Sequence, residues 1–146
     1  MKTVRELMHT PVISVGPNDS LRHVVHLMNE HHIRHVPVVE NGQLVGIVTD
    51  RDVRLHCIFL EDRYESADSF NEALDAPADG VMTRDVCVLR PDHTIDDAAA
   101  LMISEKFGGA PVVEGDSKLV GIVTYIDLLS ELRRLAHQNE NHNHHR

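Results

Sequence analysis

The chain has 146 residues, and its 23 acidic against 14 basic side chains give a formal net charge of -9, which argues against nonspecific binding to nucleic acid or to an anionic membrane. Only 3% of the residues are aromatic and none is tryptophan, so the core must be built from aliphatic side chains. This length suits one compact domain or two small repeats that share a core.

The first residues predict a short helical turn, a short strand and a longer helix. Residues 3–8 have capping-box spacing, and Pro11 ends the turn because a residue before proline avoids the helical region. Residues 12–15 predict a strand, and the turn at 16–19 supplies Asn18 or Asp19 as the cap of the next helix. The apolar residues of that helix recur at i, i+3, i+4 and i+7: Leu21, Val24, Val25 and Met28.

A β-hairpin and a second helix follow. Strands at residues 36–40 and 44–49 flank Asn41-Gly42, which is the strongest short-range hairpin signal. The next helix is predicted over residues 50–60. Residues 61–79 form an acidic segment, which we interpret as a linker with one short helix around residues 70–74.

The pattern then begins again at a fixed distance. Met82-Thr83 repeats Met8-His9, and residues 111–114 repeat 37–40, each 74 positions later. The following turn is one residue longer, so the last strand is displaced by 75. An insertion confined to a turn indicates a duplicated structural unit. The predicted organisation is repeat 1 at residues 1–60, repeat 2 at residues 80–136, and a disordered tail rich in His and Asn at residues 137–146.

Both repeats contain a strand that ends in threonine and leads into a helix with aspartate three residues later. These stretches are Gly46–Asp52 and Gly121–Asp127. A carboxylate accepts hydrogen bonds from two neighbouring hydroxyls at once, so a hydroxyl and a carboxylate at the end of a strand suit a ligand that displays sugar hydroxyls. The alternative is that each aspartate only stabilises its helix N-terminus, which contributes about 0.3–1 kcal/mol.

The duplicated pattern resembles a tandem pair of cystathionine-β-synthase (CBS) domains, called a Bateman module, over residues 1–135. The resemblance rests on the signature Gly-h-h-Thr/Ser-x-x-Asp/Asn (h apolar) in both repeats and on the Pro-Val-Val strand before each hairpin. It implies an α/β fold in which two pseudo-symmetric strand-helix-strand-strand-helix repeats pack as one module, with pairing into a homodimer. It also implies a stand-alone regulatory module, which binds AMP, ADP, ATP or S-adenosylmethionine in clefts between the repeats, needs no cofactor and signals occupancy to an effector protein.

The resemblance further implies two sets of ligand-binding residues. In the first site Thr49 and Asp52 hold the ribose, Arg34 and His35 reach the phosphates, and Arg51 helps. In the second site Thr124 and Asp127 hold the ribose, but Gly108-Gly109 replaces the basic pair, so the two sites are expected to differ. The residues implied near the base are Thr10, Pro11, Val12, Val36 and Pro37 in the first site, with Thr83, Asp85, Val86, Ala110 and Pro111 in the second.

Other readings of the sequence remain open. No nucleophile elbow, phosphate-binding loop or HExxH pattern is present, so we do not expect an enzyme. The chain also has no cationic-then-apolar signal pattern and no apolar run of membrane-spanning length, so we expect a cytoplasmic protein. The second reading is an assembly scaffold that binds no ligand. The third is a metal-binding protein, because 12 residues are histidine, but no recognisable ligand set completes a metal site.

Overall fold

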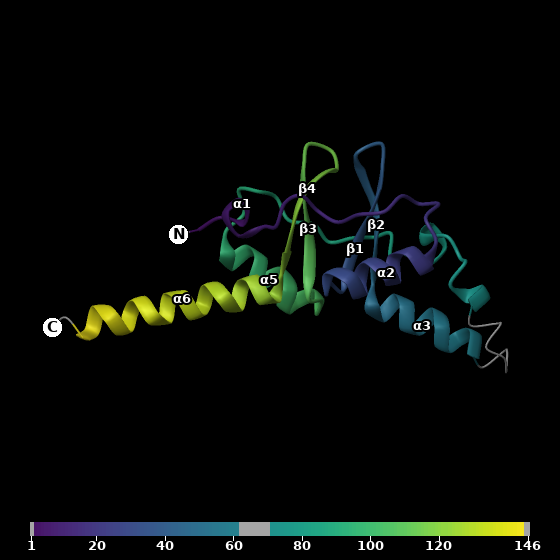
Figure 1. Cartoon of the computed structure of the whole chain (residues 1–146). Helices are drawn as coiled ribbons and strands as arrows, with labels where there is room; N and C mark the ends of the chain where they lie inside the picture. Colours follow the sequence, from purple (N-terminus) through teal and green to yellow (C-terminus); the bar gives the residue numbers. More distant parts are fainter. Residues whose placement is uncertain (1, 62–70, 145–146) are drawn as a thin grey trace. The chain divides into compact units, whose positions relative to one another are not determined.

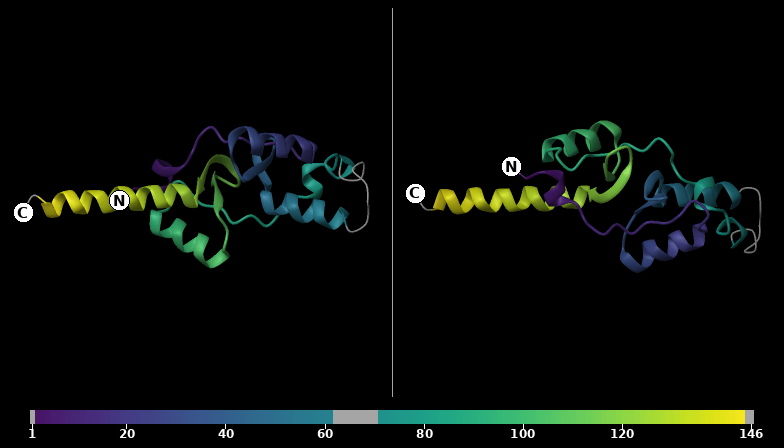
Figure 2. Two further views of the ribbon diagram at one scale, coloured as in Figure 1. Left: turned by 60° about the horizontal axis from the view of Figure 1, so that its bottom comes forward. Right: turned by 90° about the horizontal axis from the view of Figure 1, so that it is seen from above.

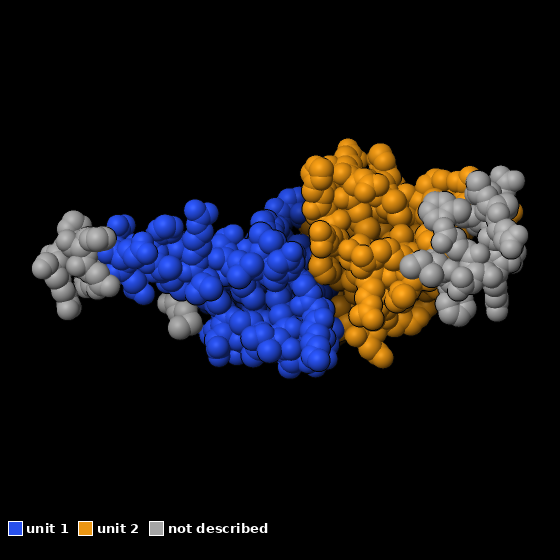
Figure 3. Space-filling view, turned by 90° about the horizontal axis from the view of Figure 1, so that it is seen from below, with its two compact units in different colours: residues 1–11, 87–114, 120–146 blue, residues 12–86, 115–119 orange. Residues whose placement is uncertain are grey.

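The computed structural model describes residues 2–61 and 71–144 (Figure 1). Its contacts divide the chain into two compact units (Figure 3). Unit 1 comprises Met1–Pro11, Cys87–Glu114 and Val120–Arg146, and unit 2 comprises Val12–Val86 and Gly115–Leu119. Each unit therefore contains segments of both predicted repeats, so the compact units do not coincide with the duplicated stretches of sequence.

Unit 2 is built around one antiparallel hairpin and two helices. The predicted Asn-Gly turn is confirmed, because Asn41 and Gly42 have φ values of 53° and 79° in the left-handed region. The predicted helix after the second strand is also confirmed. The elements are α2 (Leu21–His31), β1 (His35–Glu40), β2 (Gln43–Thr49), α3 (Asp50–Glu61) and the short 3-10 helix η1 (Ala78–Gly80).

The core of unit 2 lies between α2 and the hairpin. Leu21 and Val24 on α2 are fully buried, as the helical spacing of apolar residues predicts. Val36, Val38 and Val48 bury the facing side of the strands completely. The whole cluster consists of Val15, Leu21, Val24, Met28, Val36, Val38, Val48, Ala78 and Met82.

The strand predicted at residues 12–15 is wrong in its extent. Only Val15 pairs, in a parallel bridge with Val38. Its N–H donates to Pro37 O at 3.0 Å, and its carbonyl accepts from Val39 N at 2.8 Å. Pro37 has no N–H to donate, so the ladder cannot continue along β1.

One further prediction needs correction, and another is supported in its described part, both near α2. Its N-cap is Ser20, whose hydroxyl accepts from His23 N at 3.2 Å, whereas Asp19 accepts from Gly16 N at 2.7 Å. The described part of the acidic segment is attached to the same helix end, because Arg22 N donates to Leu74 O at 2.8 Å. Residues 71–73 are helical and overlap the short helix predicted around 70–74, although 62–70 lie outside the described residues.

Unit 1 has the corresponding elements. Its helix α5 packs against the first part of α6, and β3 and β4 are neighbouring strands. The elements are α1 (Val4–Leu7), α5 (Ile95–Glu105), β3 (Gly109–Glu114), β4 (Lys118–Thr124) and α6 (Tyr125–His144). The core consists of Val4, Leu89, Ala98, Met102, Ala110, Val112 and Val123.

The disordered tail predicted from residue 137 is wrong for its described part, because α6 continues to His144. Figures 1 and 2 show the C-terminal half of α6 standing clear of the other elements of unit 1. No Gly or Pro interrupts the helix, and extending an existing helix adds one hydrogen bond per ordered residue. His137 and Glu140, 3.7 Å apart, add an i,i+3 pair.

A buried carboxylate joins the start of the chain to α6 within unit 1. Glu131 is only 4% exposed and accepts two hydrogen bonds of 3.0 Å from Arg134 Nε. Lys2 Nζ lies 3.3 Å from the same carboxylate. These hydrogen bonds, led by that of Arg134, lower the pKa of Glu131 although burial alone would raise it. The carboxylate therefore stays ionised at neutral pH.

A methionine side chain lies against the signature glycine in each unit. A Cβ atom on Gly46 would be 2.8 Å from Met82 Cγ and 3.0 Å from Thr83 O. A Cβ on Gly121 would be 2.8 Å from Met8 Cγ and 3.0 Å from Met8 Cβ. Real side chains do not approach so closely. The glycine of the signature is therefore required because another chain segment crosses the strand there.

Replacing Gly46 by Ala should lower the free energy of unfolding by about 1–3 kcal/mol, the usual cost of overpacking. Urea unfolding followed by circular dichroism measures this loss. Gly80→Ala is the matched control, because the nearest atom to a Cβ there is Pro77 Cγ at 3.8 Å. Equal stabilities of the two variants would show that the methionine does not constrain the strand.

Candidate functional site

The junction of β2 and α3 forms a capping box around Asp52. Thr49 N–H donates to Asp52 Oδ2 at 2.9 Å, and the Thr49 hydroxyl donates to the same oxygen at 3.0 Å. Asp52 N–H in turn donates to Thr49 Oγ1 at 3.1 Å. These bonds satisfy the first amides of α3 and fix the carboxylate. The helix-capping role considered for Asp52 is thus real, and it uses mainly one carboxylate oxygen.

The second oxygen of Asp52 faces the segment that crosses β2. Thr83 and Ile47 form an antiparallel bridge, with N–H to O distances of 2.8 and 3.0 Å. This bridge brings the Thr83 hydroxyl to 3.4 Å from Asp52 Oδ1 and 3.5 Å from Oδ2, both at the weak end of the hydrogen-bonding range. Since a carboxylate has about four acceptor positions, Oδ1 can accept further hydrogen bonds.

Unit 1 repeats this arrangement around Asp127. Thr124 N–H donates to Asp127 Oδ2 at 2.7 Å, with the Thr124 hydroxyl 3.3 Å from that oxygen. His9 and Ile122 form the antiparallel bridge that corresponds to Thr83 and Ile47. His9 Nε2 lies 2.5 Å from Asp127 Oδ1, a strong contact that the first junction lacks. His9 was not among the predicted site residues, although the 74-residue repeat aligns it with Thr83.

The structure groups the predicted site residues differently from the sequence analysis. In each unit, the opening segment of one repeat meets the Thr-x-x-Asp junction of the other. Thr10 and Pro11, predicted beside Asp52, belong to the unit of Asp127, and Thr83 belongs to the unit of Asp52. Unit 2 contains Val12, Arg34, His35, Val36, Pro37, Thr49, Arg51, Asp52, Thr83, Asp85 and Val86, and unit 1 contains Thr10, Pro11, Ala110, Pro111, Thr124 and Asp127.

The backbone predicted near the base is partly occupied by bonds within the fold. Pro37 O accepts from Val15 N at 3.0 Å, and Pro111 O accepts from Leu89 N at 2.9 Å. Val36 pairs with Val48 across the hairpin and is fully buried. These residues position the strand. Thr83 and Asp85, by contrast, are exposed.

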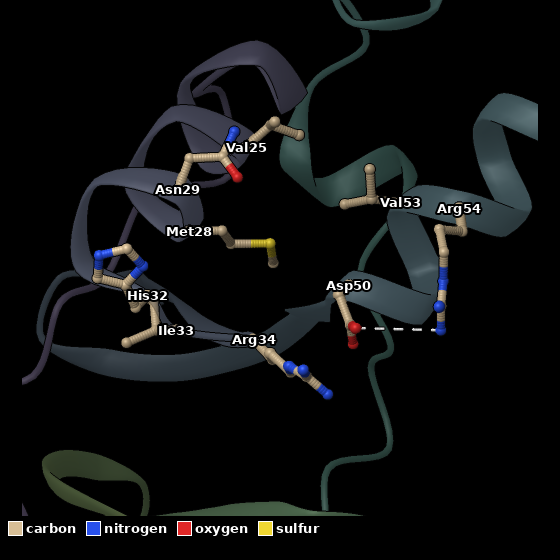
Figure 4. A pocket seen from close by; sticks show the side chains of 9 residues that line it. All are labelled: Val25, Met28, Asn29, His32, Ile33, Arg34, Asp50, Val53 and Arg54. Atoms are coloured by element: carbon tan, nitrogen blue, oxygen red, sulfur yellow. Dashed lines mark ion pairs between the residues drawn. The ribbon is translucent and has the colours of Figure 1, made fainter.

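Arg34 lines a pocket of about 570 Å³ between α2 and α3 (Figure 4). Asp50 and Arg54 form an ion pair of 3.9 Å on its α3 side. Neither Thr49 nor Asp52 lines this pocket, although Asp50 N–H at the start of α3 donates to Arg34 O at 3.0 Å. The complete lining is Val25, Met28, Asn29, His32, Ile33, Arg34, Asp50, Val53 and Arg54.

His35 is the basic residue that pairs with Thr49 across the hairpin. Burial lowers the pKa of His35, and Arg34 lowers it further, whereas Asp50 and Asp52 act in the opposite direction. At neutral pH His35 is therefore an uncharged imidazole with one N–H to donate. Arg51 is exposed in the first turn of α3.

A third Thr-x-x-Asp sequence forms a capping box of the same spacing at the start of α5, where Thr94 also bridges to Thr3. Thr94 caps α5, its N–H donating to Asp97 Oδ2 at 2.9 Å and its hydroxyl accepting from Asp97 N at 3.0 Å. Asp97 follows a loop, whereas Asp52 and Asp127 follow buried strands. The Thr-x-x-Asp spacing alone therefore defines a helix cap, and the other two junctions differ in following a strand and in the Thr83 or His9 side chain close to the aspartate.

Two further kinds of feature, metal-binding clusters and membrane-spanning helices, are absent from the described part of the chain. Within residues 2–61 and 71–144, no group of three His, Cys, Asp or Glu side chains could hold a metal ion. Among the same residues no helix is both long and apolar enough to cross a membrane.

Comparison with known proteins shows the family. The model of the CBS domain matches residues 4–57 and again 78–134, so the chain belongs to the CBS domain family and carries a tandem pair. The chain is 31% identical over 149 aligned residues to the CBS domain-containing protein YhcV of Bacillus subtilis, covering 95% of this chain and 99% of that protein. Other relatives are longer, and the chain spans 23% of one and 52% of another.

Two similar solved structures contain ligands. CBSX2 in complex with AMP matches with a TM-score of 0.76 at 27% identity, over 93% of this chain and 99% of that one. The CBS domain pair of protein MJ0100, in complex with 5′-methylthioadenosine and S-adenosyl-L-methionine, matches with a TM-score of 0.71 at 29% identity, over 90% and 95%. The predicted fold of paired CBS-type repeats is confirmed.

The lowered pKa of His35 predicts a specific loss of stability in mild acid. An unfolded histidine titrates near pH 6.5, so below that pH the unfolded chain takes up a proton before the folded chain does. The contribution of neutral His35 is complete above that pH and falls as the pH drops towards the folded-state pKa. His35→Gln should therefore reduce the difference in unfolding free energy between pH 7.5 and pH 5.5.

Urea unfolding at both pH values measures this difference, and His23→Gln on the exposed side of α2 is the control. The prediction is wrong if His35→Gln leaves the difference between the two pH values as large as in the unmodified chain.

Proposed function

We propose that this chain is a regulatory module that binds adenosine-containing ligands, such as AMP, ADP, ATP or S-adenosylmethionine, at the Thr49–Asp52 and Thr124–Asp127 junctions. The observation that carries the proposal is that the two carboxylate oxygens of each aspartate have different hydrogen-bonding partners. Oδ2 of each aspartate is held by the helix cap, whereas Oδ1, among the described residues, contacts only a side chain of the crossing segment, weakly at Asp52 and strongly at Asp127. A fixed, ionised carboxylate of this kind suits a pair of ribose hydroxyls.

The surroundings of Asp52 favour a ligand that also carries phosphate. The N-terminus of α3 contributes partial positive charge, and Arg51 lies in its first turn. His35, which pairs with Thr49 across the hairpin, adds a neutral N–H donor beside this junction. Arg34 would have to turn away from its pocket between α2 and α3 to take part.

The surroundings of Asp127 favour a less charged adenosyl compound. Gly108-Gly109 and Tyr125-Ile126 stand where the first junction has Arg34-His35 and Asp50-Arg51. The binding of AMP by CBSX2, and of 5′-methylthioadenosine and S-adenosylmethionine by the MJ0100 pair, supports adenosyl ligands of both kinds. The module would signal through an effector protein only if its ligand binds two conformations with different affinity.

Substituting the two aspartates tests this function. Asp52→Asn and Asp127→Asn should each weaken binding at its own junction by about 10- to 100-fold, because a charged acceptor contributes about 1.5–3 kcal/mol. Isothermal titration calorimetry with AMP and with S-adenosylmethionine measures both affinity and stoichiometry. Asp97→Asn is the matched control, since it alters a capping box of the same spacing and should leave ligand affinity unchanged.

Two outcomes of the titrations would contradict the proposal. If the unmodified chain binds no adenosyl compound, the proposed ligand-binding function is wrong and the alternative, an assembly scaffold that binds no ligand, is favoured. Binding that survives the double Asp52→Asn and Asp127→Asn substitution would show that the ribose is held elsewhere.

We further propose that the chain forms a homodimer through α6, whether or not it also binds a ligand. Large apolar side chains are exposed on this helix although its opposite side packs on unit 1. Leu129 is 54% and Leu132 is 63% exposed. Exposed contiguous apolar surface marks interaction sites on many proteins. The exposed set on α6 consists of Tyr125, Ile126, Leu129, Leu132 and Leu135.

A charge in the middle of this helix face should prevent assembly. Leu129→Glu is expected to convert a dimer to a monomer in size-exclusion chromatography with light scattering, because the interface would bury an unpaired carboxylate. Ser130→Glu adds the same charge to an exposed polar position and serves as the control. A monomeric unmodified chain would contradict the proposed homodimer.

A further inference from the structure

The two junctions differ most at the residue that reaches Oδ1 of the aspartate. In unit 2 this residue is Thr83, whose hydroxyl stays 3.4 Å away from Asp52 Oδ1. In unit 1 it is His9, whose Nε2 lies 2.5 Å from Asp127 Oδ1. A carboxylate only accepts hydrogen bonds, so the imidazole must be the donor. His9 therefore already fills one acceptor position on Asp127 that a ribose hydroxyl would use.

The placement of His9 is set by the backbone of its own segment. His9 N–H donates to Ile122 O at 2.9 Å, and Ile122 N–H donates to His9 O at 3.2 Å. The preceding Met8 lies against Gly121, where no side chain would fit. The bridge of Thr83 to Ile47 and the contact of Met82 with Gly46 are the same in unit 2. The two junctions therefore hold different side chains on equivalent backbones.

The burial of the pair indicates that the contact is displaceable. The Asp127 side chain is only 11% exposed, whereas the His9 side chain is 67% exposed. A largely exposed imidazole can rotate away into solvent without emptying a packed core. Asp127, by contrast, is held in place by the cap of α6.

We propose that His9 is the residue that determines specificity between the two sites, acting as a resident competitor for the ribose hydroxyls at Asp127. This inference rests on the proposed function. Binding of a vicinal diol at Asp127 must break the His9 contact, whereas binding at Asp52 breaks no comparable bond. The Asp127 site is therefore the weaker of the two for the same adenosyl ligand, independently of phosphate charge.

Reciprocal substitutions test this inference. Asp52→Ala leaves only the Asp127 site, and in that background His9→Thr should tighten AMP binding by about tenfold in calorimetry. Asp127→Ala leaves only the Asp52 site, and there Thr83→His should weaken AMP binding by about tenfold. Because the two swaps act in different units, misfolding of one variant does not remove the other measurement.

A second readout follows His9 directly. In the unmodified chain, ¹⁵N NMR of the imidazole should show a protonated Nε2 that is perturbed by Asp127→Asn. Addition of AMP should release His9, so that its ring resonances move towards those of the Asp127→Asn variant.

The outcomes separate this inference from the proposed function. If the unmodified chain binds no adenosyl ligand, the function itself fails. If the chain binds but His9→Thr weakens the affinity of the Asp127 site, His9 contributes to binding. If that affinity does not change, His9 has no effect on binding. Either result overturns the inference alone. Unchanged His9 resonances on AMP binding at the Asp127 site would overturn it as well.

Discussion

The contact between a methionine and a glycine on the neighbouring strand is the constraint on which each unit depends. Met82 covers Gly46 in unit 2, and Met8 covers Gly121 in unit 1. The bridge that follows each methionine then brings the next side chain to the carboxylate at the start of the helix. Core packing, the strand-to-helix junction and the candidate site are therefore set by one crossing. A side chain on either glycine would disturb all three.

Much of the fold could be predicted because its determinants are local. The turn at Asn41-Gly42 and the start of α3 at Asp50 follow from residues a few positions apart. The pairing of segments could not be predicted in the same way. Gly46 and Gly121 stand in nearly identical sequences, so periodicity cannot decide which of them Met8 covers. The same ambiguity led us to group Thr10 with Asp52, although the two belong to different units.

The candidate site was only partly predictable for a related reason. The spacing Thr-x-x-Asp occurs at Thr49, Thr124 and also Thr94, and in all three places the aspartate accepts from the threonine amide. The Thr-x-x-Asp spacing predicts only the helix cap, which depends on residues close in sequence. The surroundings of the second oxygen depend instead on a long-range contact, and the residue that makes it at Asp127, His9, is 118 positions away in the sequence. The binding residues themselves stay predictions.

The interleaved composition of the units has a consequence for the origin of the fold. A single repeat would carry a methionine with no glycine strand to cover and a glycine strand with no methionine. Two identical copies could satisfy both needs by exchanging their opening segments, as in a domain-swapped dimer with an isologous interface. Joining two such copies end to end converts an exchange between molecules into an exchange within one chain. Fusion then lets the two halves diverge, and a histidine in one crossing and a threonine in the other become possible.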